Sequence, residues 1–200
     1  MSDARPSSPS AWPSTALLVV DVQESLRHRP YWQNADVPAF IERQQALIDG
    51  AKARGLPIVQ VLHVEERGVF SLASGFVRTL SPLVIEPDVL FHKNRHSALV
   101  GTGLDVWLIQ RGIRCVIVSG ARTEQCCETT ARHASDLGFD VDYVMEATLT
   151  FASTDRHGTV WSAQDIKART GLVLEGEFAR IVTVDEALAG VESTARAASA

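Results

Sequence analysis

The sequence contains few cysteines, no long apolar run and no cluster of positive charge, and each absence argues against a class of protein. It has three cysteines in 200 residues, an odd number, and two of them are adjacent, so a disulfide framework is not expected. No stretch approaches the roughly 18 uninterrupted apolar residues of a membrane span, and the N-terminal segment lacks the apolar core of a signal peptide. We therefore expect a protein of a reducing, cytoplasmic compartment that does not enter a membrane.

Positive charge is also scarce. The 19 lysine and arginine residues are outnumbered by 24 acidic residues, which gives a formal net charge of −5. The basic residues are scattered and form no stripe suited to a phosphate backbone, so nucleic acid is not an expected partner. A small neutral or modestly charged substrate fits this composition better.

What is present is a regular alternation of strand and helix patterns. Short apolar runs typical of buried parallel strands occur six times, at 16–22, 57–64, 88–93, 114–120, 139–145 and 179–184. Amphipathic patterns typical of helices lie between them, at 36–55, 102–111, 124–137 and 160–170. The alternation predicts right-handed βαβ units and an α/β fold, a three-layer α/β/α sandwich with a six-stranded, mostly parallel sheet.

The domain organisation follows from length and composition. The chain is long enough for one domain with a full core and too short for two generous ones, so we expect a single domain over 15–190. Residues 1–14 are rich in serine and proline and are expected to form a disordered tail. A second tail is expected at 191–200.

Polar residues at the ends of the predicted strands are the first candidates for chemistry, because ligands bind beyond the carboxyl ends of parallel strands. Asp21 ends the first strand, Lys93 ends the third, and the fourth runs into the loop that contains Cys126. A charge at the end of a buried strand is costly unless it is paired, so Asp21 and Lys93 could pair with each other. The ordinary alternatives are a capping aspartate, a lysine that faces solvent and a packed thiol.

Two adjacent cysteines follow the fourth strand, and their positions distinguish them. In a helix that begins near 123–124, Cys126 lies in the first turn, where the helix dipole and a nearby ammonium would lower the pKa of its thiol. Cys127 is in phase with the small residues of the same helix and is expected to face the sheet. Cys115 lies inside an apolar strand. We predict that Cys126 is a nucleophile and that Cys127 and Cys115 belong to the core.

Three segments resemble the isochorismatase-like cysteine hydrolases. They are LLVVDVQ around Asp21, FHKNRHSALVGTGLDVWLIQRGI around Lys93, and VIVSGARTEQCCETTARHASDLGFDVDYV around Cys126. Together they cover most of 15–150, in the order and at the spacing found in that family. The resemblance implies that Asp21, Lys93 and Cys126 form a catalytic triad on a six-stranded parallel sheet.

The resemblance also implies the surroundings of the cysteine. It places a non-proline cis peptide bond between Ala121 and Arg122, which directs the backbone amides of Arg122 and Cys126 into an oxyanion hole. Family members usually form oligomers, so a homodimer or homotetramer is expected.

The reaction that the resemblance implies is hydrolysis of the C–N bond of a small amide or carbamoyl compound through a thioester. The nicotinamidase branch has an Asp-x-His pair and further histidines for a metal after the second strand, whereas this chain has His63 alone there. We predict no metal and no cofactor. Two alternatives stay open: a vinyl ether hydrolase of the isochorismatase type, and a binding or scaffold protein of the same fold without catalytic activity.

Candidate walls of a substrate pocket lie in the loops that follow the strands. They are Gln23, Tyr31, Trp32, Phe70 and Phe76, with Arg122 from the cysteine loop. Ordinary loop packing or an oligomer contact would explain these residues equally well. Arg95 could meet a substrate carboxylate, although a surface ion pair is the more common role. The other histidines, His96 and His133 among them, are expected at the surface or in loops.

Overall fold

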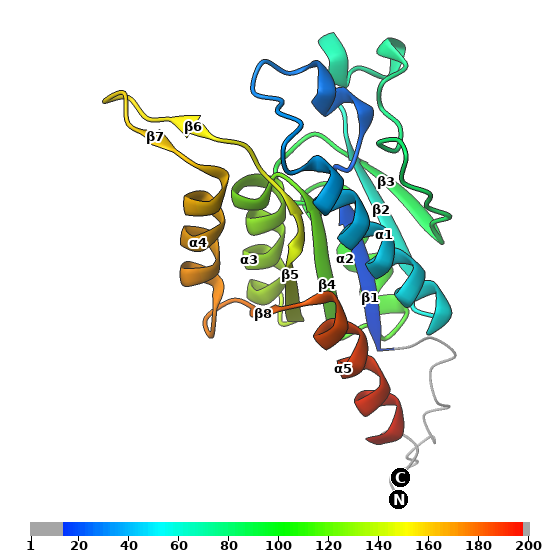
Figure 1. Ribbon diagram of the computed structural model, residues 1–200. Helices are drawn as coiled ribbons and strands as arrows, with labels where there is room; N and C mark the ends of the chain where they lie inside the picture. Colours follow the sequence, from blue (N-terminus) through cyan, green and yellow to red (C-terminus); the bar gives the residue numbers. More distant parts are fainter. Residues whose placement is uncertain (1–13, 198–200) are drawn as a thin grey trace, which may run out of the picture.

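A computed structural model describes the backbone of residues 14–197 and the side chains up to residue 191. It contains one central sheet with helices on both faces (Figure 1). The strands of this sheet are β1 (Thr15–Val20), β2 (Ile58–His63), β3 (Val89–Lys93), β4 (Cys115–Ala121), β5 (Asp140–Leu149) and β8 (Arg180–Val182). The helices are α1 (Val37–Ala53), α2 (Leu104–Gln110), α3 (Glu128–Asp136), α4 (Ala163–Leu174) and α5 (Val184–Ala197).

The sheet has the strand order β3-β2-β1-β4-β5-β8, and every neighbouring pair is parallel. All six predicted strands are present, and the predicted three-layer α/β fold is confirmed. The order reverses direction at β1, which lies between β2 and β4. In parallel sheets this reversal leaves a crevice at the carboxyl ends of the central strands, where ligands bind.

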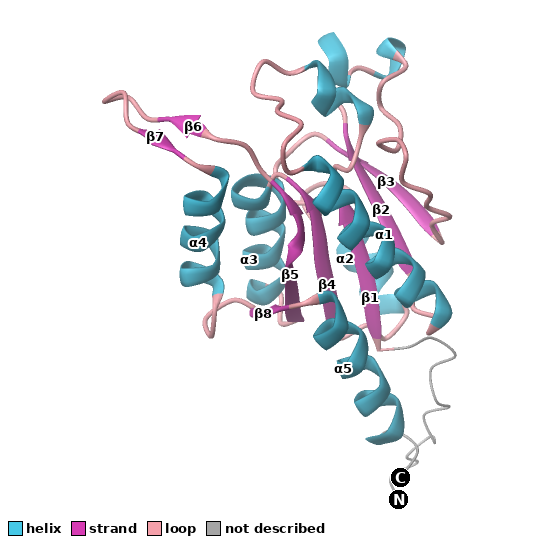
Figure 2. Cartoon of the chain, viewed as in Figure 1, coloured by secondary structure: helices cyan, strands magenta, loops and turns pink. Residues whose placement is uncertain are grey.

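Two apolar layers hold the sheet between its helices. On one face, side chains of β1 such as Leu17 and Val19 pack against α1 and α5; on the other face, Leu18 and Val20 pack against α2, α3 and α4. Figure 2 shows the same division into layers. Because alternate residues of β1 are buried on both faces, the strand is a continuous apolar run, as the sequence pattern indicates.

Several elements differ from the prediction. The chain after β8 forms α5, which continues to Ala197, so most of the segment 191–200 that was expected to be a tail is helical. The predicted N-terminal tail lies outside the described residues except for Ser14. β5 extends to Leu149, and a short antiparallel hairpin of β6 (Ser153–Thr154) and β7 (Val160–Trp161) projects from the body of the molecule (Figure 1). In the part of the chain that the structure describes, no helix is long and apolar enough to cross a membrane.

Gly120 brings the end of β4 unusually close to the end of β1. Its φ is +126°, and a Cβ at this position would lie 2.0 Å from the carbonyl oxygen of Val20. A side chain is therefore excluded on two grounds, backbone conformation and space. The close approach fixes the loop that follows β4 directly beside Asp21, which follows β1.

Candidate active site

The ends of four neighbouring strands converge at the carboxyl edge of the sheet. Lys93 is the last residue of β3 and pairs in register with His63 of β2. Asp21 follows β1, and its N–H donates to the carbonyl of Val61 in β2. The loop after β4 delivers Cys126, so the three predicted residues come from three different segments and meet at one point.

The ammonium of Lys93 lies at the centre of this cluster, and its side chain is fully buried. Its Nζ is 2.6 Å from Oδ2 of Asp21 and 3.3 Å from Sγ of Cys126. It also lies 3.1 Å from the carbonyl oxygen of Arg95 and 3.2 Å from Nδ1 of His63. Burial alone would lower the pKa of Lys93, but the negative charge of Asp21 and the neighbouring sulfur raise it above its ordinary value. The lysine is therefore a cation, and it contacts both the carboxylate and the thiol.

Asp21 is held in an unusual backbone conformation. Its φ of 54° lies in the left-handed region, and no other non-glycine residue of the described chain has a positive φ. Such a conformation costs of order 1–3 kcal/mol and concentrates at functional sites. Burial raises the pKa of the Asp21 carboxyl, and the Lys93 ammonium opposes that rise. Its Oδ2 pairs with the lysine, while the buried Oδ1 has no hydrogen-bond partner, which leaves one acceptor available for a proton.

Cys126 lies in a π-helical turn, Thr123–Cys127, instead of the first turn of an ordinary helix. The N–H groups of Gln125 and Cys127 both donate to the carbonyl of Arg122, which closes the turn. The Tyr143 hydroxyl donates to the Thr123 carbonyl at 2.7 Å and anchors the turn to β5. The peptide bond between Ala121 and Arg122, just before the turn, is cis. π-Turns are rare and occur frequently at functional sites.

The prediction of a lowered thiol pKa is wrong. Burial raises the pKa of Cys126 to about 12, and the Asp21 carboxylate adds to the rise while Lys93 opposes it. The sequence argument considered the helix dipole and the lysine, but it could not include the loss of solvent around a sulfur whose residue is only 9% exposed. The cysteine is therefore a thiol at rest. Cys127 is fully buried, as predicted, whereas Cys115 is only partly buried and does not belong fully to the core.

A cavity of about 210 Å³ opens beside the cysteine, and Asp21 and Cys126 form part of its wall. Two of the five predicted pocket residues, Tyr31 and Phe70, line it, and so does Arg122. This volume is below the range of about 300–1,000 Å³ that is usual for ligand pockets, which favours a small substrate.

The other three predicted pocket residues do not line the cavity. The buried Gln23 accepts a hydrogen bond from the N–H of His63 and donates to its carbonyl, so it ties β1 to β2. Trp32 packs against Phe151, and Phe76 stacks on His28. Each of the three has a packing role, which is the ordinary alternative that the sequence left open.

Several cavity residues were not predicted, and most of them lie in segments between the strands, whose course the sequence does not determine. They are Leu26, Arg29, His63, Glu65, His96, Ala121 and Gln125. His96 was expected at the surface without a role; it is exposed, but its Nδ1 lies 3.7 Å from Sγ of Cys126. His133 accepts or donates a hydrogen bond with Ser97 at 2.9 Å, which links the loop after β3 to α3. For His96, the one signal in the sequence was its position three residues after Lys93.

A metal site is not evident in the described part of the chain. Within residues 14–191, no three or more side chains of histidine, cysteine, aspartate or glutamate are arranged to hold a metal ion. Burial lowers the pKa of His63, and the Lys93 ammonium lowers it further, so this imidazole is neutral at neutral pH. Metal independence stays a prediction that a chelator can test.

Comparison with known proteins identifies the family. The isochorismatase domain matches residues 15–177 of the chain. The isochorismatase family protein YrdC of Bacillus subtilis (strain 168) is 27% identical over 174 residues, which are 86% of this chain and 92% of YrdC. The crystal structure of an isochorismatase-family protein from Burkholderia xenovorans LB400 superposes with a TM-score of 0.82 at 30% identity, over 91% of this chain and 89% of that one.

A shorter similarity extends to a protein of named activity. Nicotinamidase 3 of Arabidopsis thaliana is 41% identical over 78 residues, which are 39% of this chain and 39% of that protein. Because the domain match covers most of the chain and the crystal structure superposes over nearly all of it, the chain belongs to the isochorismatase family of hydrolases.

Proposed function

We propose that this protein is a cysteine hydrolase that cleaves the C–N bond of a small amide or carbamoyl compound through a thioester. The observation that carries the proposal is the position of one buried ammonium, 2.6 Å from the carboxylate of Asp21 and 3.3 Å from the sulfur of Cys126, beside a small cavity. A nucleophile, a base and a group that stabilises charge are thus within contact distance of one another.

In the first half of the proposed reaction, Asp21 accepts the thiol proton and Cys126 Sγ forms a bond to the carbonyl carbon. The carbonyl oxygen becomes an oxyanion, and the backbone amides of Arg122 and Cys126 are the proposed donors to it. The C–N bond then breaks, and the nitrogen takes the proton from Asp21 and leaves as ammonia or an amine.

In the second half, a water molecule gives a proton to Asp21 and its oxygen attacks the thioester carbon. The C–S bond breaks, the acid leaves, and the sulfur recovers the proton from Asp21. Lys93 stays charged throughout and stabilises whichever of Asp21 and Cys126 is the anion. Because burial keeps Cys126 protonated at rest, the mechanism requires Asp21 to take the thiol proton as the sulfur attacks.

The similarity to a plant nicotinamidase supports an amide as the substrate, although it covers only part of each chain. The alternative of vinyl ether hydrolysis would leave the buried thiol without a role. The alternative of a binding protein would leave unexplained the strained Asp21 and its unpaired oxygen. These features favour the hydrolase.

The test is a panel of small amides, ureas and carbamoyl compounds scored by ammonia release, with isochorismate as the contrasting vinyl ether. We expect Cys126→Ala to reduce turnover of the best amide by at least about 10³-fold. Cys127→Ala is the matched control, since this neighbouring thiol is fully buried in the core, and it should lose stability and retain most activity. Equal loss of activity in both variants, or cleavage of isochorismate alone, would refute the proposal.

The oligomer is a separate proposal. The homodimer or homotetramer implied by the family can be measured by light scattering after size-exclusion chromatography, independently of activity.

A further inference from the structure

We propose that Thr148 and Lys167 are positioning residues, which fix the turn that carries Cys126 and so aim its sulfur at the substrate carbonyl. Neither residue lines the cavity beside the sulfur, so both act through the turn and not through contact with a substrate. The inference rests on the proposed function for the part that the turn plays in acyl transfer, whereas the hydrogen bonds that carry it are independent of that function.

An irregularity of β5 brings Thr148 behind the turn. The pairing of β4 with β5 is regular up to Val118 and Tyr143, and it resumes at Gly120 and Thr148. β5 therefore advances by five residues where β4 advances by two. Such bulges bend a strand, redirect its side chains and are over-represented next to active sites.

The Thr148 hydroxyl is bonded to the first residue of the turn. It accepts a hydrogen bond from the hydroxyl of Thr123 at 2.8 Å, and it donates to the carbonyl of Met145 at 2.8 Å. Both threonines are fully buried, so water does not compete for these bonds. Because a buried hydroxyl that loses its partner is costly, the pair holds Thr123 in one orientation.

Lys167 fixes Thr148 from the opposite side. β8 pairs with β5 only as far as Val144, and beyond that point Nζ of Lys167, on α4, donates to the backbone carbonyl of Thr148 at 2.6 Å. Burial lowers the pKa of this ammonium, and the charge of Asp36 opposes the fall. A cation is costly where water is scarce, so the position of Lys167 is explained by the bond that it makes to β5.

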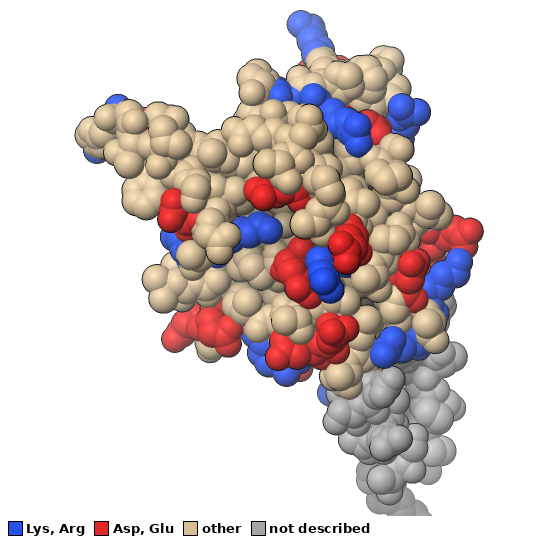
Figure 3. Space-filling view, viewed as in Figure 1, with Lys and Arg blue, Asp and Glu red and all other residues tan. Residues whose placement is uncertain are grey.

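Further hydrogen bonds hold the rest of the turn. The Thr150 hydroxyl donates to the carboxylate of Glu124, and the Thr130 hydroxyl donates to the carbonyl of Cys126, each at 2.6 Å. The hairpin that joins β5 to α4 stands clear of the body in Figure 3, and most of its side chains are exposed, so its packing does not support the turn. Hydrogen bonds from β5 and α4 provide that support on this side.

The position of the sulfur matters because acyl transfer needs two alignments at once. Sγ of Cys126 must face the carbonyl carbon while the carbonyl oxygen meets the donors that stabilise it as an oxyanion. A misplacement of about 1 Å can cost about 10²-fold in rate. Alkylation by iodoacetamide needs only the first alignment, because the sulfur displaces iodide at a saturated carbon and no oxyanion forms. Two reactions at one sulfur can therefore separate its position from its reactivity.

The experiment compares two reagents at Cys126. p-Nitrophenyl acetate transfers its acetyl group to the sulfur through an oxyanion, and p-nitrophenolate leaves; iodoacetamide alkylates the same sulfur, and iodide leaves. The acylation rate is the release of p-nitrophenolate by the wild type minus that by Cys126→Ala, and peptide mass spectrometry gives the alkylation rate. Both reactions require loss of the thiol proton, so the ratio of acylation to alkylation cancels a change in the thiol pKa.

The variants remove one hydrogen bond at a time. Thr148→Val keeps the shape of the side chain, and we expect the ratio to fall about tenfold. Thr148→Ser retains the hydroxyl and should restore the ratio to within about twofold of the wild type. Lys167→Met should lower it about threefold, because only the carbonyl of Thr148 loses a donor. Alkylation itself should stay within about twofold in all three variants.

Matched controls test whether any loss of packing has the same effect. Thr15 is a buried threonine at the amino end of the sheet, and Thr15→Val should leave the ratio unchanged whatever its effect on stability. Lys52→Met removes an exposed lysine that pairs with Glu86, and it should also leave the ratio unchanged. An unchanged ratio in Thr148→Val, or an equal fall in Thr15→Val, would overturn the inference. If Thr148→Val does not fold, an unchanged ratio in Lys167→Met overturns it.

Failure of the proposed function gives a different result. If no amide or carbamoyl compound is hydrolysed and the ratio still falls in Thr148→Val and recovers in Thr148→Ser, the positioning role stands and the proposed function fails. If an amide is hydrolysed, we expect Thr148→Val to lower kcat about tenfold and to leave KM within about twofold. Unchanged kcat in that variant would leave the proposed function standing and refute this inference, and a wild type without Cys126-dependent acylation would refute both.

Discussion

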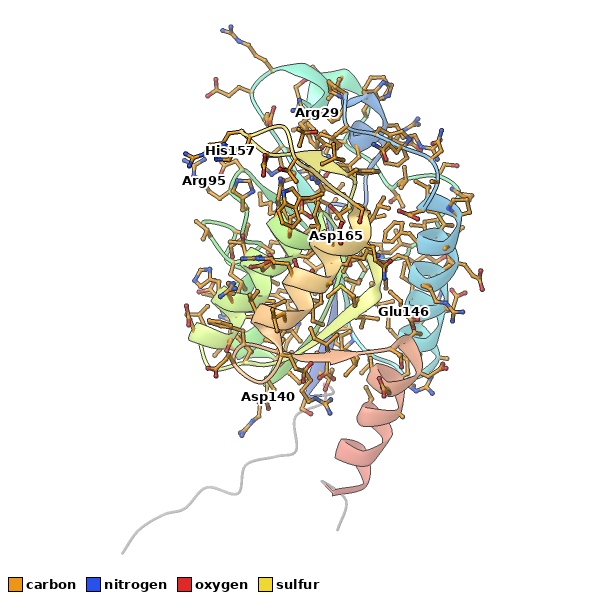
Figure 4. The ribbon with its side chains drawn as sticks, turned by 60° about the vertical axis from the view of Figure 1, so that its left-hand side comes forward. Arg29, Arg95, Asp140, Glu146, His157 and Asp165 are labelled. Atoms are coloured by element: carbon orange, nitrogen blue, oxygen red, sulfur yellow. The ribbon has the colours of Figure 1, made fainter. Side chains whose placement is uncertain are left out.

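The carboxyl and amino ends of the sheet each hold a cavity in which a cysteine lies near a carboxylate and a cation. At the carboxyl end these are Cys126, Asp21 and Lys93; at the amino end they are Cys115, Asp142 and Arg180. The cavity at the amino end is the larger, about 580 Å³ against about 210 Å³. Figure 4 shows the two ends, with Arg29 at the top and Asp140 at the bottom. Composition does not distinguish the two ends, and the larger cavity is not the one beside Cys126.

Even the two thiols are alike in one respect. Burial raises the pKa of Cys115 to about 12, with the carboxylates of Asp142 and Asp140 adding to the rise, and burial raises that of Cys126 to about 12 as well. The carboxylates differ. Asp142 lies in regular β5, and Arg180 donates to each of its oxygens at 2.8 Å. Asp21 has a strained φ and one oxygen without a hydrogen bond. Incomplete pairing, and not the presence of the groups, marks the end at which we propose the reaction.

The largest expected difference between the two ends comes from neutralising each carboxylate. Asp21→Asn removes the proposed base and should reduce kcat/KM for the amide by about 10³-fold. Asp142→Asn should leave kcat/KM within twofold and lower the free energy of unfolding by about 1–2 kcal/mol, because Arg180, which is itself largely in solvent, loses its charged partner. Steady-state kinetics and urea denaturation of both variants measure this. A loss of activity in Asp142→Asn comparable with that of Asp21→Asn would break the comparison.

A smaller difference is expected from removing each cation. Lys93→Met takes away the charge that opposes the high pKa of Cys126, so we expect about a 10²-fold loss of turnover and slower alkylation of Cys126 by iodoacetamide at pH 8. Arg180→Met should slow only the alkylation of Cys115, since Arg180 lowers the pKa of that thiol and is not among the groups that shift the pKa of Cys126 or Cys127. Peptide mass spectrometry over time resolves the two sites. Unchanged turnover in Lys93→Met would remove the lysine from the proposed mechanism.

The smallest effect concerns the raised thiol pKa, which the two ends share. Between pH 9 and pH 12 an unfolded cysteine has lost the proton that Cys115 and Cys126 retain in the folded protein. The unfolded chain then binds fewer protons, so the free energy of unfolding falls as pH rises through this window and is unaffected by these thiols below it.

We therefore expect Cys115→Ala and Cys126→Ala each to flatten the decline of stability above pH 9, by at most about 1.4 kcal/mol per pH unit. Urea denaturation at pH 8, 9 and 10 under reducing conditions measures the slope. If only Cys115→Ala flattens it, the pKa of Cys126 is lower than its burial indicates, and the two ends differ even in this respect.

The sequence predicted what depends on chain pattern and missed what depends on solvent and loops. The apolar runs determined the sheet, and its carboxyl edge brought together Asp21, Lys93 and Cys126. The predicted direction of the Cys126 pKa shift was wrong, because the shift depends on burial, and burial is a property of the folded protein. Gln23 does not line the cavity, because a polar residue after a strand can face either a cavity or a neighbouring strand. Arg29 was missed because the course of a long loop has no periodic signal.

The separation of the three cysteines has a consequence for oxidation. Oxidation of Cys126 would be slow while it stays a buried thiol, but any sulfenic acid that formed would normally be resolved as a disulfide by a second thiol. Cys127 is fully buried against the sheet, and a bond between adjacent residues is strained. Cys115 begins β4 and Cys126 follows its end, so roughly 20 Å of strand separate them. The chain holds no resolving thiol, and an oxidised enzyme would depend on an external thiol for repair or pass irreversibly to the sulfinic acid.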